Sequence, residues 1–229
     1  MAPSSSELEQ LLSRMFQAHP WHGVEAGDPN DFVTAYVEIV PIDAVKYELD
    51  KPSGHLRIDR PQRFSSLPPT LYGFIPQTYC GAQVGLRADE RCNRKGIKGD
   101  GDPLDVCILT EKVISAGNFL ARVRPIGGFR MLDGDEADDK IIAVLEADLA
   151  FGEVSELSEI RKPLVDRLLH YFSSYKQLPT EQHRKVEIAE VYDQAEAREV
   201  IKLSMRDYRD SFGAPEARIG RLQKLLAGE

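Results

Sequence analysis

The segment from Gly99 to Leu109 reads GDGDPLDVCIL and combines two unlike halves. Its first half places three carboxylates close together, at Asp100, Asp102 and Asp105, and its second half is an apolar run typical of a buried strand. Two carboxylates held about 5 Å apart at an effective dielectric near 20 repel by roughly 3 kcal/mol. The segment therefore predicts a strand that begins beside a bound cation.

The aspartates of this segment also allow other interpretations. Hard cations such as Mg²⁺ take oxygen ligands and keep several waters, so convergent carboxylates suit them. A solvated Asp-Gly turn is equally compatible with these aspartates taken alone. An EF-hand loop fits poorly, because the bidentate glutamate that should follow is missing. A phosphate-binding P-loop is excluded, since no Gly-Lys-Ser/Thr follows the glycines.

A second acidic turn, MLDGDEADDK, favours the metal interpretation. It carries Asp133 and Asp138 and leads through Lys140 into the apolar segment IIAVLE. Because side chains alternate along an extended chain, Asp138 and Lys140 share one face. One such turn is more often a surface feature, but two that each open onto an apolar strand favour a shared metal site.

Basic residues occur in similar contexts. Lys46 and Glu48 share a face of the alternating segment AVKYELD, Arg60 ends HLRIDR, and Lys176 follows Tyr175 at the end of a helical pattern. Each is an ordinary surface charge when taken singly. Together they supply the cations that a polyanionic substrate needs, while the carboxylates hold neutralising metal ions.

The composition bounds the class of protein. The 229 residues include 29 Lys and Arg against 37 Asp and Glu, and the resulting net charge of −8 argues against a nucleic-acid partner. No apolar run approaches the ~20 residues of a membrane span, and the N-terminus lacks a signal-peptide core. The cysteines at 80, 92 and 107 show no CxxC spacing. We therefore expect a cytoplasmic protein without a membrane partner.

Periodicity predicts a mainly β protein of the α+β class, in which a strand meander closes into a small barrel or sandwich. Two or three helices lie on one side of it. Residues 1–30 form an N-terminal extension, and residues 213–229 form a C-terminal helical tail. The predicted strands cover residues 32–40, 44–50, 55–60, 105–109, 118–125, 140–146 and 185–192, and the predicted helices cover residues 6–17, 163–175, 194–211 and 214–226.

The motif DGDPLDV resembles the signature of the soluble family I inorganic pyrophosphatases, which is D-x-D-P-x-D followed by an apolar strand. The segments VEIVP, VKYELD, GHLRIDR, YGFIP, RPIGG, DDKIIAV and HYFSSYK are similar to that family in the same order. The resemblance spans roughly Val37 to Tyr208. The HPWHG opening and the long insertion before Gly99 resemble the chlamydial type of bacterial enzyme.

The resemblance implies a closed five-stranded OB-like β-barrel, a catalytic domain over residues 31–212 and a homo-oligomer. It implies several Mg²⁺ ions per active site, which Mn²⁺, Zn²⁺ or Co²⁺ can replace. The implied metal-binding residues are Glu38, Glu48, Asp100, Asp102, Asp105, Asp133 and Asp138. The implied substrate-binding residues are Lys46, Arg60, Tyr72, Lys140, Tyr175 and Lys176, and the implied catalytic residues are Asp102, Tyr175 and Lys176.

The implied reaction is hydrolysis of inorganic pyrophosphate to two orthophosphates by metal-activated water. In it Asp102 orients the water and takes its proton, while Tyr175 and Lys176 hold the leaving phosphate. One alternative is a metal-dependent phosphohydrolase that acts on short polyphosphate or nucleotides. Another is an inactive barrel that binds divalent ions or a partner protein. The complete set of acidic and basic positions disfavours the inactive barrel.

The insertion between Tyr79 and Gly99 reads as a solvated surface loop, although its basic residues could instead line the rim of the active site. Those residues are Arg87, Arg91, Arg94, Lys95 and Lys98.

Overall fold

The computed structural model describes residues 7, 10, 16–63, 65–176 and 186–228. Most of the helix expected over residues 6–17 lies outside this part of the chain. None of the described helices is long and apolar enough to cross a membrane.

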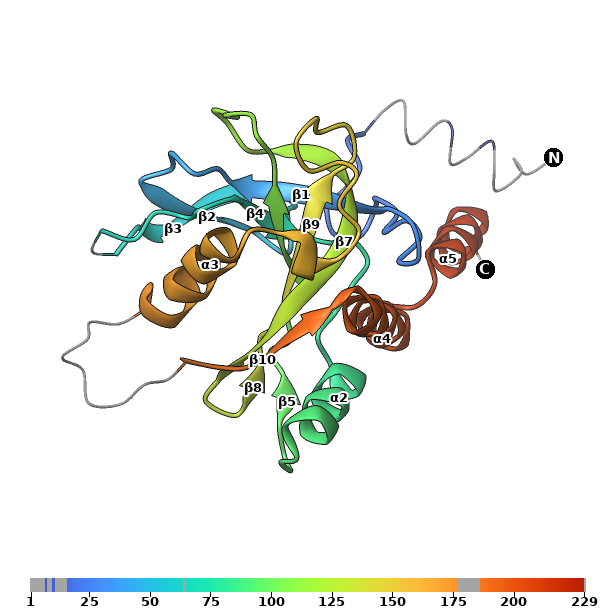
Figure 1. The fold of residues 1–229 in the computed structure, drawn as a ribbon. Coiled ribbons are helices and arrows are strands. Elements are labelled where there is room, and N and C mark those ends of the chain that lie inside the picture. Colours follow the sequence, from blue (N-terminus) through green and yellow to red (C-terminus); the bar gives the residue numbers. More distant parts are fainter. Residues whose placement is uncertain (1–6, 8–9, 11–15, 64, 177–185, 229) are drawn as a thin grey trace.

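Five strands pair in a closed ring (Figure 1). Each pair in the ring is antiparallel except β6 with β9, which is parallel. In chain order the ring runs first, second, third, fifth, fourth and back to the first, which is the Greek-key order of the OB-fold. The expected five-stranded OB-like architecture is confirmed. Around the ring the strands are β1 (Val33–Ile39), β4 (Leu71–Phe74), β6 (Asp105–Leu109), β9 (Lys140–Leu145) and β7 (Phe119–Asp133).

The long strand β7 holds the ring together and extends beyond it. Its first part pairs with β1, and its second part pairs with β10 (Val186–Asp193). The sequence predicts a strand that ends at Pro125, because Gly127 and Gly128 look like a turn. The strand continues because Tyr192 of β10 packs directly over Gly128, where a Cβ atom would lie only 2.4 Å from the tyrosine ring.

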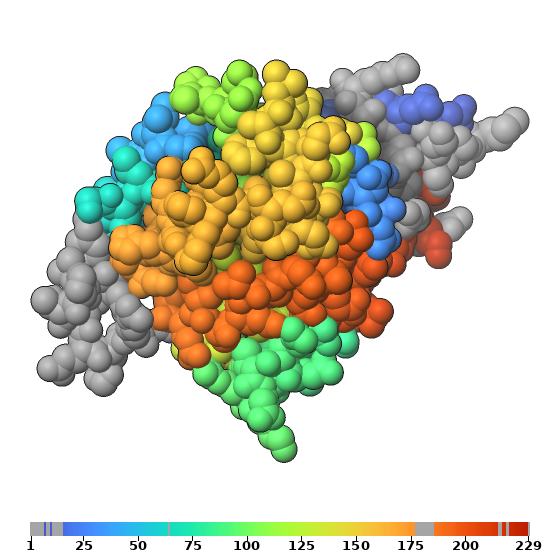
Figure 2. Space-filling model, viewed as in Figure 1, coloured from blue at the N-terminus to red at the C-terminus, as the bar shows by residue number. Residues whose placement is uncertain are grey.

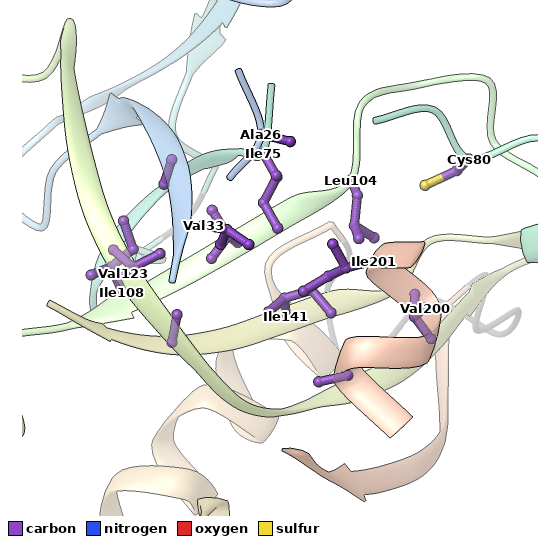
Figure 3. Close-up of a cluster of buried hydrophobic side chains, with 14 of the residues drawn as sticks. Ala26, Val33, Ile75, Cys80, Leu104, Ile108, Val123, Ile141, Val200 and Ile201 are labelled. Carbon is purple, nitrogen blue, oxygen red and sulfur yellow. The ribbon is translucent and has the colours of Figure 1, made fainter. Parts of the chain in front are cut away.

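Two apolar cores lie on the two faces of β9. Ile141 packs in the core between the barrel and α4 (Gln194–Phe212), together with Val200 and Ile201 (Figure 3). Its neighbour Ile142 belongs to a second core under α3 (Lys162–Ser174). Because β9 is buried on both faces, it reads as a continuous apolar run and not as an alternating one.

The insertion before the aspartates is a helix, so the predicted solvated loop is wrong. Helix α2 (Ala82–Cys92) buries Val84 and Ala88 against the rest of the molecule. Figure 2 shows its surface below the orange-red surface of β10 and α4. Its N-cap, Gly81, has no side chain to cap the helix, and Asp207 of α4 accepts hydrogen bonds from the backbone of Gln83 and Val84 instead.

The remaining elements complete the shell around the barrel. A separate two-stranded hairpin stands beside the barrel mouth, and Trp21 packs into an aromatic cluster with Tyr208 of α4. The four-residue strand β4 is missing from the sequence-based prediction because two prolines precede it and a glycine interrupts its apolar pattern. These elements are β2 (Val45–Leu49), β3 (Leu56–Pro61), β5 (Lys98–Gly99), β8 (Glu136–Ala137), η1 (Leu157–Glu159) and α5 (Pro215–Ala227).

Candidate active site

A cleft of about 250 Å³ opens between the barrel mouth, the β2–β3 hairpin and the end of α3. All thirteen of the predicted site residues line it, although they come from eight different segments of the chain. They are Glu38, Lys46, Glu48, Arg60, Tyr72, Asp100, Asp102, Asp105, Asp133, Asp138, Lys140, Tyr175 and Lys176.

Short backbone pairings bring the two acidic segments together. Strand β5 leads into Asp100 and pairs in parallel with β8, which leads into Asp138. The turn between β5 and β6 is held by a bond from the Asp102 backbone N–H to Asp100 Oδ1 at 2.9 Å. A further bond joins the Cys80 N–H to the Asp102 carbonyl at 2.8 Å. The predicted sharing of one site by both acidic turns therefore has a structural cause.

Lys140 lies between two of these carboxylates. It is opposite Asp105 in the β6–β9 register, and its Nζ donates to Asp105 Oδ2 at 2.5 Å and to Asp138 Oδ1. Tyr72 donates its hydroxyl to the same oxygen of Asp105, also at 2.5 Å. Burial opposes the charge of Lys140, but Asp105 and Asp138 raise its pKa, so this lysine stays protonated.

Glu38 closes the opposite wall of the cleft. Its side chain is buried and accepts a hydrogen bond from the Leu49 N–H at 2.7 Å, which ties the hairpin to β1. Burial raises the pKa of Glu38 to about 8, and the charge of Asp105 acts in the same direction. This carboxyl is therefore protonated at neutral pH unless a cation approaches it.

The aspartates differ in their charge states. Burial and the neighbouring Asp138 raise the pKa of Asp100 to about 8, and burial also raises the pKa of Asp105. Burial opposes ionisation of Asp138 as well, but Lys140 and Lys176 lower its pKa overall. A divalent cation can replace the protons that Glu38 and Asp100 hold, and it would offset the repulsion between these two carboxylates and Asp105. An all-oxygen set of this kind fits a hard cation.

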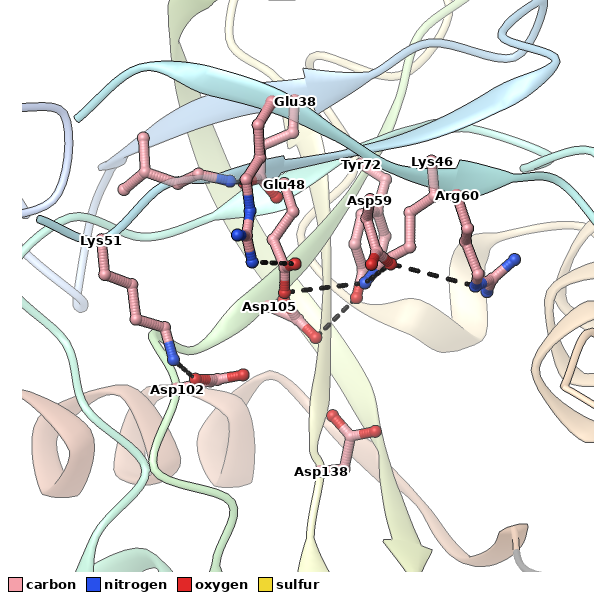
Figure 4. Close-up of polar contacts among 12 residues, drawn as sticks. Glu38, Lys46, Glu48, Lys51, Asp59, Arg60, Tyr72, Asp102, Asp105 and Asp138 are labelled. Atoms are coloured by element: carbon pink, nitrogen blue, oxygen red, sulfur yellow. Dashed lines mark hydrogen bonds and ion pairs between the residues drawn. The ribbon is translucent and has the colours of Figure 1, made fainter. Parts of the chain in front are cut away.

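The hairpin and α3 supply the positive charges. Lys46 Nζ lies 3.1 Å from Asp59 Oδ2 and 3.8 Å from Glu48 Oε1, and Figure 4 shows this group facing Asp105. At the end of α3, Lys176 Nζ donates to Asp133 Oδ2 at 2.5 Å and lies over the ring of Tyr175.

Three charged residues near the site are absent from the sequence-based prediction, and one of them is Glu136 of β8, which lines the cleft. Lys51 reaches across the cleft to Asp102 Oδ1, and Asp59 lies between Lys46 and Arg60. Lys51 and Asp59 belong to the same hairpin as the predicted residues, but Lys51 lies in its turn and Asp59 at its β-bulge, so strand alternation places neither of them.

The basic residues of the insertion lie elsewhere. Arg87, Arg91 and Arg94 pair with Glu196, Glu190 and Glu187 respectively. No basic residue of the insertion is among the described residues that line the cleft, so a role at its rim is not supported.

A five-stranded barrel whose mouth combines clustered carboxylates with fixed cations defines a metal-dependent enzyme for a small, highly charged anion. The carboxylates repel one another unless a metal cation lies among them. The lysines and Arg60 are more numerous than that purpose needs, and they can bind the oxygens of a phosphate substrate. The site therefore indicates hydrolytic chemistry on phosphate groups.

Comparisons with known proteins identify the family. A family model described as inorganic pyrophosphatase matches residues 35–209. An inorganic pyrophosphatase of Chlamydia trachomatis serovar L2 is 50% identical over 200 residues, which cover 85% of this chain and 96% of that protein. The chain belongs to the soluble inorganic pyrophosphatase family, whose members require a divalent metal, and its resemblance to the chlamydial enzymes is confirmed.

Solved structures agree with the fold. The inorganic pyrophosphatase of Thermus thermophilus matches with a TM-score of 0.69 and 23% identity, and covers 84% of this chain and 99% of that one. The enzyme of Coxiella burnetii matches with a TM-score of 0.66 and 30% identity, and covers 81% and 99%.

Proposed function

We propose that this chain hydrolyses inorganic pyrophosphate to two orthophosphates with Mg²⁺ as its metal. The observation that carries the proposal is the single cleft in which every predicted acidic and basic residue meets. Membership of the inorganic pyrophosphatase family supports the same reaction.

The carboxylates have the role of holding Mg²⁺. Asp100, Asp105 and Asp138 line the cleft at the barrel mouth, the side chains of Asp102 and Asp133 are more exposed than that of Asp138, and Glu38 and Glu48 line it from β1 and β2. Bound Mg²⁺ lowers the pKa of a water molecule and offsets negative charge on the substrate. Mn²⁺, Zn²⁺ and Co²⁺ accept similar ligands and are expected to substitute.

Asp102 is the proposed proton acceptor. Its side chain is 44% exposed, whereas Asp105 and Asp138 are more deeply enclosed and engaged by Lys140. Among the described residues Asp102 forms an ion pair with Lys51, and both side chains are open to solvent. Asp102 is therefore positioned to orient an incoming water molecule and to take its proton.

The cationic side of the cleft holds the phosphates. Burial opposes the charge of Lys176, but Tyr175 and Asp138 raise its pKa. Burial also raises the pKa of Tyr175, so its hydroxyl keeps its proton and can donate a hydrogen bond. Lys176 and Tyr175 hold the leaving phosphate as its charge grows. Lys46, Arg60, Tyr72 and Lys140 bind the remaining phosphate oxygens.

A single assay separates this proposal from its alternatives. Phosphate release is measured from pyrophosphate, tripolyphosphate and ATP, with Mg²⁺ present and with EDTA. We expect release from pyrophosphate alone, and only with Mg²⁺. Equal release from ATP would indicate a nucleotide phosphohydrolase. That outcome is disfavoured because Tyr171 and Tyr175 stack with ring centroids 5.1 Å apart, so the face that each ring turns to the other is closed to a base. No release from any substrate would indicate the inactive barrel.

We also propose that the chain acts in the cytoplasm, without membrane or nucleic-acid partners, and forms a homo-oligomer. The cysteines 80, 92 and 107 are free thiols, as is usual in a reducing compartment.

Leu225 and Leu226 on α5 are 66% and 71% exposed and offer an apolar contact for a second copy. Light scattering of the full chain measures its oligomeric state. The same measurement on a chain that ends at residue 212 tests whether the tail 213–229 is separate from the catalytic domain 31–212. A second truncation that begins at residue 31 tests the division at the extension 1–30.

A further inference from the structure

A second group of buried charges lies behind the cleft, on the other face of the acidic segment that precedes β9. Asp138 and Lys140 face the cleft, so the side chain of Asp139 between them points the opposite way. It is 2% exposed and lies 3.4 Å from Arg130 Nη2 of β7. Tyr192 also donates its hydroxyl to Asp139 Oδ2 at 3.3 Å.

Arg130 connects Asp139 to elements far from it in the chain. It is 1% exposed and donates to Glu196 of α4 at 2.7 Å and to Glu190 of β10 at 2.6 Å. Glu196 in turn accepts two bonds from Arg87 of α2, at 3.1 and 2.5 Å. A continuous chain of ion pairs thus runs from Asp139 through Arg130 and Glu196 to Arg87 of α2.

Both ends of this chain adjoin proposed metal ligands. Asp139 is the neighbour of Asp138, and α2 leads through β5 directly into Asp100. A shift of α2 relative to β9 that carried β5 with it would change the separation between Asp100 and Asp138.

Stability alone explains this cluster poorly. Arg130 Nε and Asp139 Oδ1 are buried and have no hydrogen-bond partner among the described residues. A buried ion pair that leaves polar atoms unsatisfied is weak evidence for a stabilising role, and fixing one arrangement of the surrounding elements is the better attested use of such a pair.

We infer that Arg130 is a positioning residue for the metal site: through Asp139 on one side and Glu196 with Arg87 on the other, it holds the two acidic segments at the separation that metal binding needs. The inference rests on the proposed function only in taking Asp100 and Asp138 as metal ligands. Arg130 itself touches neither substrate nor metal.

The test is direct titration of the full-length protein with Mn²⁺ by calorimetry, without substrate. Arg130→Met and Asp139→Ala each raise the Mn²⁺ dissociation constant roughly tenfold, which is typical of lost outer-shell support. Asp139→Asn keeps an acceptor for Arg130 and restores affinity close to that of the natural chain. The matched control is Arg124→Met, because Arg124 also lies in β7 but bonds the carbonyls of Gly152 and Val154. It leaves the dissociation constant unchanged.

A folded Arg130→Met or Asp139→Ala protein with natural Mn²⁺ affinity would overturn the inference, and so would equal weakening by Arg124→Met. If Arg130→Met does not fold, the Mn²⁺ dissociation constants of Asp139→Ala and Asp139→Asn are compared, and equal values would overturn the inference. Saturating Mg²⁺ restores the turnover of the positioning variants, which loss of a catalytic residue would not permit. If the natural chain binds Mn²⁺ but releases no phosphate from pyrophosphate, the proposed function fails while the Mn²⁺ comparison still decides the role of Arg130.

Discussion

The two clusters of charge on either side of β9 differ in balance. Behind the strand, three arginines meet three enclosed carboxylates, and the exposed Glu90 also pairs with Arg87, so the charges nearly balance without any added ion. At the cleft, eight carboxylates face five cationic side chains, and several of the carboxylates have raised pKa values. The excess negative charge and the raised pKa values indicate that the cleft binds a cation, whereas the cluster behind the strand needs no ligand and positions the elements around it.

The largest expected effect comes from the exposed acid of the cleft. Asp102→Asn removes the proposed proton acceptor and lowers the rate of phosphate release by a factor of roughly 10² to 10⁴, the usual contribution of general base catalysis. The melting temperature is unchanged because Asp102 is half exposed. Asp135→Asn is the control, since Asp135 lies on the second acidic turn with its side chain 75% exposed. A near-natural rate in Asp102→Asn would remove Asp102 from this role.

A smaller effect is expected on the cationic side. Lys176→Ala raises the KM for pyrophosphate roughly tenfold or more, because a hydrogen bond to a charged group contributes about 1.5 kcal/mol or more. Metal affinity changes less, since Lys176 is not a ligand. The measurement is steady-state kinetics together with Mn²⁺ titration, and Lys162→Ala at the exposed start of the same helix is the control. Equal losses of substrate and metal affinity would contradict the assignment.

Removing metal should invert the pH dependence of stability. Glu38 and Asp100 have folded pKa values of about 8, above those of the unfolded chain. The unfolded chain therefore loses these protons first, and metal-free stability falls as pH rises from about 4 to 8. Bound Mg²⁺ replaces the protons, so its stabilisation grows over the same range. Melting curves in EDTA and in Mg²⁺ at pH 5 and 8 measure this. A melting temperature in EDTA that rises between these pH values would refute it.

The smallest effect is expected at the N-terminal cap of α2, away from the cleft. Asp207→Ala removes the acceptor that caps α2 and lowers stability by about 1–2 kcal/mol, as the loss of a helix cap usually does. In a chain of this size the melting temperature falls by roughly 2–4 °C for each kcal/mol. Asp210→Ala, at an exposed position on the same helix, is the control. Turnover of Asp207→Ala at saturating Mg²⁺ stays equal to that of the natural chain. A large loss of turnover would contradict the purely structural role given to Asp207.

The sequence predicted the cleft better than its surroundings for a physical reason. Acidic and basic residues at the mouths of short strands follow the alternation of side chains, so the spacing of Asp138 and Lys140 is enough to assign them to one face. Helix α2 could not be predicted in this way, because its capping acid, Asp207, comes from a distant helix. Lys51 and Asp59 are placed by the turn and the β-bulge of the β2–β3 hairpin and not by strand alternation.

The double burial of β9 has a consequence for how the barrel assembles. An apolar run that is enclosed on both faces looks the same after a slip by one residue, so hydrophobicity cannot fix its alignment with β6. The misaligned chain would turn Asp139 toward the solvent-filled mouth and drive Lys140 into the interior beside Arg130. The alternating charges of Asp138, Asp139 and Lys140 at the start of β9 thus fix its register with β6. Residues proposed for the chemistry therefore also specify the fold.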